Sequence, residues 1–220
     1  MFQYLTANTV VELICFIAAL LCLATDKSYV WRAMILYLLT TCITELMGIY
    51  ISGPHKLISN HWLYNIFLLC EGGFTHLMFA HLIGKYTNSK PVIFTGLAIF
   101  IGIYIYELTN NYNHHLYIYN IQTFTVMSVL FVLYSLYYYY LQLKDDSYVV
   151  LKYSPEFWWV AGTLFFYFTN TACNIFFNQL KTITLWNGYH LTHYIFRLLN
   201  IILYSCWSYS FICRKWISKY

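Results

Sequence analysis

Four ionisable side chains interrupt long apolar stretches of this sequence, and they are its first candidates for chemistry. Glu12, Glu45, Glu71 and Arg197 each lie well inside a run of mainly hydrophobic residues. A charge at the centre of a membrane-spanning helix costs about 3 kcal/mol on insertion scales, so each such residue indicates a functional site. Carboxylates bind amines or hydroxyl groups, and an arginine binds an anionic group or pairs with a carboxylate. These four residues therefore predict a polar site inside a membrane.

Neutral polar residues near these charges follow helical spacing. His193, Arg197 and Asn200 share one face of a helix, because they are four and three residues apart. Asn170 and Asn174 share a face of another helix in the same way. Counting about 1.5 Å per residue places the carboxylates and the arginine in one layer, about 10 to 15 Å from the outer helix ends. We therefore expect an outward-facing ligand pocket formed by Glu12, Glu45, Glu71, Asn170, Asn174, His193, Arg197 and Asn200.

The composition identifies the surroundings of this layer as lipid. Of the 220 residues, 60% are hydrophobic and only 9% are charged, whereas a soluble domain carries about 25% charged residues. One crossing of a bilayer about 30 Å thick needs about 20 apolar residues, and backbone inside lipid must be hydrogen-bonded within helices. We therefore predict one all-α domain, residues 1–220. It is a polytopic seven-transmembrane-helix bundle with approximate spans 5–23, 29–51, 62–83, 91–108, 117–141, 157–180 and 191–213.

Lysine and arginine residues divide unequally between the two ends of these spans. Only Lys56 and Lys181 fall at one end, and Arg197 lies within a span. The opposite end holds the remaining basic residues, Lys27, Arg32, Lys85, Lys90, Lys144, Lys152, Arg214, Lys215 and Lys219. Because basic loops stay in the cytoplasm, the N-terminus is expected outside and the C-terminus inside, in a multi-pass protein of the inner membrane. This asymmetry accounts for the net charge of +4, so we expect the lipid bilayer as partner and no nucleic acid.

The sequence lacks the motifs that would name a reaction. A retinal protein needs a lysine in its last helix, and the seventh predicted span contains none before Lys215. Neither an H-E-x-x-H zinc motif nor a C-x-x-C pair occurs in the sequence. All seven cysteines fall inside predicted helices, which argues against a disulfide framework in the loops. We therefore predict no metal site and no cofactor, and we assign no catalytic residue.

Residues 37–83 carry polar positions in both of the helices that they form. Glu45 lies late in the second predicted span, and Tyr64 and Asn65 precede Glu71 in the third. This pattern resembles a family of small seven-helix integral membrane proteins of unknown function from bacteria of the Bacteroidetes type. The resemblance implies an inner-membrane location and polar positions at Glu45, Asn65 and Glu71, and it implies no activity.

Polarity on one side of the membrane, without a catalytic motif, favours a receptor-like or sensory protein. It would bind a small polar or amphiphilic ligand, and its short cytoplasmic loops would pass the signal to a separate partner protein. Two other functions stay open: a proton-coupled small-molecule transporter, and an intramembrane lipid-modifying enzyme with Glu45 or Glu71 as general base. A purely structural layer, in which Arg197 pairs with one carboxylate and the asparagines join helices, is the remaining alternative.

Overall fold

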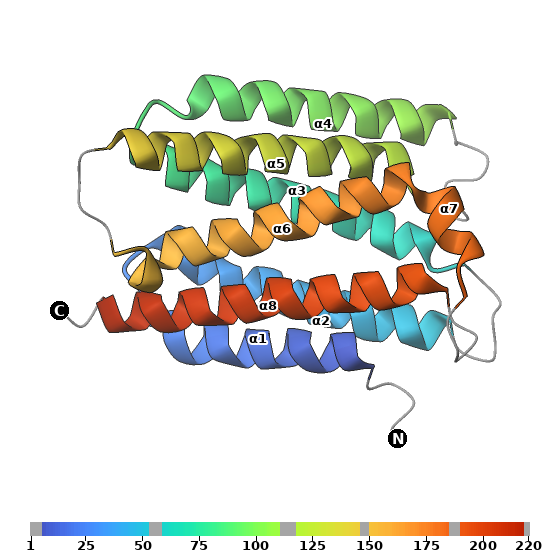
Figure 1. The fold of residues 1–220 in the computed structure, drawn as a ribbon, viewed down its shortest axis with the longest axis horizontal. Helices are drawn as coiled ribbons and strands as arrows, with labels where there is room; N and C mark the ends of the chain where they lie inside the picture. The colour runs from blue at the N-terminus through green and yellow to red at the C-terminus, as the bar shows by residue number, and fades with distance from the viewer. Residues whose placement is uncertain (1–5, 53–58, 111–117, 146–149, 185–189, 218–220) are drawn as a thin grey trace.

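The computed structural model describes residues 6–52, 59–110, 118–145, 150–184 and 190–217 (Figure 1). These residues are helical apart from turns, short connections and one isolated bridge between Thr184 and His190. The all-α fold predicted from the sequence is therefore confirmed. The elements are α1 Ala7–Leu23, α2 Tyr29–Ile51, α3 His61–Ile83, α4 Lys90–Asn110, α5 Ile121–Lys144, a 3₁₀ turn Leu151–Tyr153, α6 Pro155–Ile175, α7 Phe177–Thr182 and α8 Leu191–Ile217.

Five of these helices are long and apolar enough to cross a membrane, namely α2, α3, α4, α5 and α8. α1 is also apolar but has only 17 residues. α6 has 21 residues and stands outside the set of five, because its tryptophans and asparagines lower its mean hydropathy. The chain is therefore a helical membrane protein with at least five helices suited to the hydrocarbon core.

The helix boundaries differ most from the prediction in the sixth span. Residues 157–180 were expected to form one helix, but α6 ends at Ile175 and the short α7 bends away from it (Figure 1). Phe176 leaves the helical conformation, and its N–H donates to the carbonyl oxygens of Ala172 and Asn174, which closes the last turn of α6. The other six expected spans agree with their helices to within four residues. Positions 5 and 117, where two of those spans begin, lie outside the described residues.

Six helices form a closed ring. α1 packs on α2, α2 on α3, α3 on α5, α5 on α6 and α6 on α8, and α8 returns to α1. α4 stands outside this ring and packs on α3 and α5 (Figure 1). Because successive long helices alternate in direction, the starts of α1, α3, α5 and α8 meet at one end, which we call the N-terminal end. The opposite end, where α8 finishes, is called the C-terminal end.

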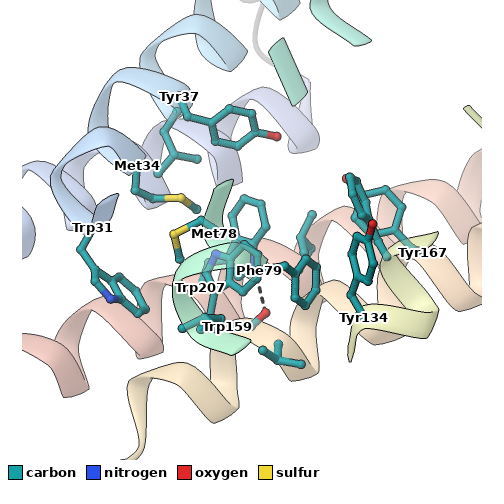
Figure 2. Close-up of a cluster of buried hydrophobic side chains, with 14 of the residues drawn as sticks. Trp31, Met34, Tyr37, Met78, Phe79, Tyr134, Trp159, Tyr167 and Trp207 are labelled. Carbon is teal, nitrogen blue, oxygen red and sulfur yellow. Dashed lines mark hydrogen bonds between the residues drawn. The ribbon is translucent and has the colours of Figure 1, made fainter. Parts of the chain in front are cut away.

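Aromatic side chains fill the interior toward the C-terminal end (Figure 2). Trp159 of α6 and Trp207 of α8 stack with ring centroids 5.7 Å apart, and Phe79 of α3 meets Trp159 edge-on at 5.4 Å. Trp207 Nε1 donates a hydrogen bond of 3.3 Å to the carbonyl oxygen of Trp159. α6 and α8 approach closely at Gly162, where an added Cβ would lie 2.8 Å from Cβ of Cys206. We call Phe79, Trp159 and Trp207 the aromatic plug.

The outer surface of the bundle is apolar. Leu21, Leu36 and Phe168 lie on three different helices and are each more than 60% exposed. A water-soluble protein rarely exposes so many large apolar side chains along its helices, whereas lipid is as apolar as these side chains are. The distribution of apolar groups therefore supports the membrane environment that the composition predicts.

Ion pairs join the helix ends at the C-terminal end. Arg214 donates to both carboxylate oxygens of Asp26, at 2.8 and 3.3 Å, and to Glu156 Oε1 at 3.5 Å. Lys85 donates to the same oxygen of Glu156 at 2.6 Å. Burial disfavours the charged form of Asp26, but hydrogen bonds from Arg214 and from the backbone N–H of Ser28 outweigh burial and lower the pKa of Asp26. Asp26, Lys85, Glu156 and Arg214, called the ion network below, connect the α1–α2 turn with α3, α6 and α8.

Candidate functional site

A cavity of about 200 Å³ lies inside the ring toward its N-terminal end. It is lined from α1, α2, α3, the start of α5, α6 and α8, and the peripheral α4 contributes none of its lining residues. The lining residues are Glu12, Tyr37, Thr41, Thr44, Glu45, Tyr64, Phe67, Glu71, Tyr119, Phe124, Phe166, Tyr167, Asn200, Leu203, Tyr204 and Trp207. The cavity is therefore where the helices of the ring bring their polar faces together.

Three carboxylates from three successive helices line this cavity. Glu12 of α1 is only 6% exposed, and its Oε2 has no hydrogen-bond partner among the described residues. Glu45 of α2 accepts a hydrogen bond of 3.3 Å from the hydroxyl of Tyr64. Glu71 of α3 accepts a shorter one, 2.6 Å, from the hydroxyl of Tyr167 on α6. One oxygen of Glu45 and one oxygen of Glu71 are therefore each bound by a different tyrosine hydroxyl. The second oxygen of each carboxylate has no hydrogen bond within the described residues.

The contact between Glu45 and Tyr64 depends on a small residue one turn away. Gly48 follows Glu45 by three positions on α2, so the two residues share a face of that helix. The Tyr64 ring lies directly against Gly48, in the space that a Cβ would occupy. Glycine at this position therefore lets the tyrosine of α3 reach across to the carboxylate of α2.

Aromatic rings form most of the remaining wall. Nine of the sixteen lining residues are Phe, Tyr or Trp. Tyr37 stacks on Phe74 with ring centroids 4.5 Å apart and meets Trp207 edge-on at 6.1 Å, so it is held in one orientation. Tyr204 meets the same tryptophan edge-on at 5.8 Å. Trp207 belongs to both the cavity wall and the aromatic plug, so the cavity ends where the plug begins (Figure 2).

The structure brings together four of the eight site residues expected from the sequence. Glu12, Glu45, Glu71 and Asn200 line the cavity. The other four, Asn170, Asn174, His193 and Arg197, are not among its lining residues.

The four residues away from the cavity have different environments. Asn170 is buried and Asn174 half-buried, and the side-chain nitrogen of each has no hydrogen-bond partner within the described residues. His193 is exposed and packs edge-on against the ring of Tyr194. Arg197 is half-buried, and no ion pair joins it to the three cavity carboxylates in the described part of the chain. The pairing that the sequence suggested for this arginine is therefore not formed here.

Tyrosines are the site residues that were missing from the expected set. Tyr37, Tyr167 and Tyr204 do lie on the polar faces of their helices, at spacings of three or four residues from Thr41, Asn170 and Asn200, which is the signal that could have found them. Tyr64 and Tyr119 carry no such signal, because their partners come from other helices.

One buried carboxylate was also missed, and its role is structural. Glu107 of α4 is 6% exposed and accepts hydrogen bonds from the backbone N–H groups of Gln122 and Thr123, at 3.2 and 2.9 Å. It also accepts one from the Thr123 hydroxyl at 2.8 Å. These donors are in the first turn of α5, where backbone N–H groups have no partner within the helix. Glu107 therefore caps α5 from the neighbouring helix.

Asn65, which the family resemblance singled out, holds the chain just before α5. Its Nδ2 donates to the carbonyl oxygen of Ile118 and its Oδ1 accepts from the N–H of Asn120, both at 3.0 Å. This pair of bonds fixes the segment that carries Tyr119 into the cavity wall. Asn65 is therefore a positioning residue for the site.

Comparison of the chain with protein families, with curated proteins and with solved structures finds no match. Membership of the Bacteroidetes-type family therefore stays a prediction. Within the described residues, no group of three or more His, Cys, Asp and Glu side chains is arranged to hold a metal ion. The fold and the site together define a helical membrane protein with a small cavity whose wall is both acidic and aromatic.

Proposed function

We propose that this chain is a receptor-like seven-helix membrane protein that binds a small polar ligand in the cavity within its ring. The observation that carries the proposal is the cavity itself, because six helices contribute to a single polar space inside an otherwise apolar bundle. Helix-lined cavities with a few convergent polar groups are typical ligand sites. A ligand that contacts all six helices at once can change how they pack, which is what a receptor requires.

The distribution of basic residues supports an outward-facing site. Of the basic residues in the described part of the chain, Lys181 at the end of α7 lies at the N-terminal end and Arg197 lies within α8. The others, Lys27, Arg32, Lys85, Lys90, Lys144, Lys152, Arg214 and Lys215, lie at the C-terminal end. Lys56 and Lys219 lie outside the described residues. By the positive-inside rule, the C-terminal end faces the cytoplasm of an inner-membrane protein and the cavity opens toward the outside. In this orientation the proposal includes seven crossings, with α1 and α6 as the two additional spans.

The aromatic plug favours binding over transport. A transporter needs polar groups that continue through the bundle, whereas Trp207 and Trp159 stack directly below the cavity, and Phe79 packs against them. No observation of comparable weight supports the lipid-modifying enzyme, because no serine, cysteine or histidine is among the described residues that line the cavity beside the candidate bases Glu45 and Glu71.

The ion network offers a route by which binding would be sensed on the cytoplasmic side. α1, α3, α6 and α8 line the cavity, and the same network connects these four helices at the opposite end. A change in helix packing around a ligand would therefore alter the geometry of Arg214 and Glu156. A separate cytoplasmic or membrane partner that contacts this end would receive the signal.

Native mass spectrometry with elemental analysis of the detergent-purified chain tests the proposal. We expect a small organic molecule to co-purify with the wild-type protein and to be lost from Glu71→Gln. The control is Lys90→Gln, which removes an exposed charge from α4, outside the ring, and leaves both the cavity and the ion network intact. If the folded Glu71→Gln and Glu45→Gln variants retain the same bound molecule as the wild type, the cavity is not the site. A stoichiometric metal ion would instead support the enzyme, and uptake into proteoliposomes driven by a pH step would support the transporter.

A further inference from the structure

The charge of the cavity limits what can bind there. Glu12, Glu45 and Glu71 line it, and none of the described residues that line it is a lysine, arginine or histidine. An ionised carboxylate buried without a counter-ion costs several kcal/mol, and a protein avoids that cost by protonating the group or by placing a cation or hydrogen-bond donors beside it. Tyr64 and Tyr167 each donate to one of these carboxylates, and the Tyr204 hydroxyl lies beside Glu12. A cationic ligand would supply the positive charge that these lining residues lack.

The carboxylates also present free hydrogen-bond acceptors. Tyr64 bonds to Oε2 of Glu45 and Tyr167 bonds to Oε1 of Glu71, so the second oxygen of each group has no hydrogen bond within the described residues. Glu12 lines the cavity too, and its Oε2 is buried with no partner among the described residues. Each of the three carboxylates thus has an oxygen without a hydrogen bond. An ammonium group has three N–H donors and no acceptor, which matches this set.

The aromatic wall supports the same conclusion independently of the carboxylates. Nine lining residues are aromatic, and Leu203 is the one aliphatic residue among the described residues that line the cavity. The face of an aromatic ring carries partial negative charge and attracts an organic cation, most strongly where water is excluded. An anion or a carboxylate ligand would meet both the aromatic faces and the acidic groups unfavourably.

The size of the cavity sets an upper limit on the ligand. A volume of about 200 Å³ is below the usual range of about 300 to 1,000 Å³ for drug-sized ligands. The ligand therefore has few non-hydrogen atoms beyond the ammonium nitrogen, and a peptide or a lipid headgroup with its phosphate exceeds the space.

We propose that the cavity binds a compact primary alkylammonium ion, whose nitrogen is held by Glu12, Glu45 and Glu71 and whose short carbon chain lies against the aromatic wall. This inference rests on the function proposed above and specifies its ligand class. It does not include the anionic group that Arg197 could have held in the pocket, because Arg197 is not part of the cavity wall.

Thermal unfolding of the full-length chain in detergent, with a panel of probes of similar size, tests the inference. The probes are n-butylamine, n-butanol, butyrate, tetramethylammonium and sodium ion, at matched ionic strength and up to tens of millimolar. We expect n-butylamine to raise the unfolding midpoint in a saturable way, and the other four to have no comparable effect. Tetramethylammonium is the sharpest comparison, because it keeps the positive charge and lacks the N–H donors.

Variants then locate the site. Glu12→Gln removes the carboxylate whose oxygen lacks a partner, and we expect it to weaken n-butylamine binding at least tenfold in isothermal titration calorimetry. Lys90→Gln, on the peripheral α4, is expected to bind n-butylamine as the wild type does. If Glu12→Gln does not fold, Glu45→Gln is the second variant, and the probe panel on the wild type decides the ligand class without either one.

Failure of this inference differs from failure of the proposed function. Stabilisation by n-butanol or butyrate that is lost in Glu71→Gln would keep the cavity as the binding site and overturn the ammonium. Stabilisation by sodium ion or tetramethylammonium as strong as that by n-butylamine would overturn the requirement for N–H donors. No stabilisation by any probe, together with no co-purified molecule, would overturn both proposals.

Discussion

Replacing Arg214 with glutamine is expected to destabilise the whole bundle, although this residue lies near the end of α8, at the C-terminal end of the bundle. The guanidinium contacts Asp26 through two hydrogen bonds of 2.8 and 3.3 Å and lies 5.3 Å from the ring centre of Trp31. The Asp26 side chain is only 3% exposed, so it cannot recover the lost contacts from water. The variant therefore leaves a buried carboxylate with fewer partners.

The magnitude follows from these contacts. Removing one partner of a buried ion pair costs about 3 to 5 kcal/mol. The Arg214 side chain is 23% exposed and the N–H of Ser28 still donates to Asp26 at 2.7 Å, so part of the loss is recovered. We expect a loss of about 3 kcal/mol, which for a chain of this length lowers the unfolding midpoint by about 6 to 12 °C.

Thermal unfolding of the purified protein in one detergent measures this loss. The matched control is Lys90→Gln, which removes a positive charge from an exposed position at the same end and is expected to change stability by less than about 0.5 kcal/mol. The double variant Asp26→Asn with Arg214→Gln should be less destabilised than the sum of the two single variants, because the two residues share one interaction. The reasoning is refuted if Arg214→Gln loses no more stability than Lys90→Gln.

Three further outcomes are expected from the same unfolding assay. The pKa of Asp26 is lowered in the folded protein, so the contribution of Asp26 to stability is complete above the ordinary value of 3.8 and is lost as the pH falls further. Asp26→Asn should therefore lose less stability in acid than the wild type does, and an unchanged loss of stability in acid would contradict this reasoning. Glu107→Ala removes the cap on α5 and should cost about 1 to 2 kcal/mol, whereas Glu107→Gln keeps one acceptor for Thr123 and should cost less; equal losses would exclude the capping role. Gly162→Ala should cost about 1 to 3 kcal/mol by separating α6 from α8, whereas Gly73→Ala, with no neighbouring atom within 4 Å, should gain up to about 1 kcal/mol.

The sequence alone determined the fold class, the approximate positions of the helices other than the break between α6 and α7, and the three acidic residues that line the cavity. Hydropathy along the chain and the need to satisfy every backbone group in lipid require helices, and the boundaries follow where charged or turn residues interrupt the apolar runs. Glu12, Glu45 and Glu71 stand out because ionised groups in such runs are rare and costly. These properties are local, so they can be read without knowing which helices touch.

The tertiary structure decided which polar residues meet. Depth along a helix placed Arg197 and the three carboxylates in one layer, but the ring order and the rotation of α8 leave Arg197 off the cavity wall. Tyr64 and Tyr167 enter the site because they face carboxylates on other helices, with Tyr167 96 residues from its partner Glu71. Contacts between helices depend on packing of whole faces across the bundle, including close approach at glycines. Spacing within one helix does not encode that packing, so the partner of each buried carboxylate emerged only from the folded chain.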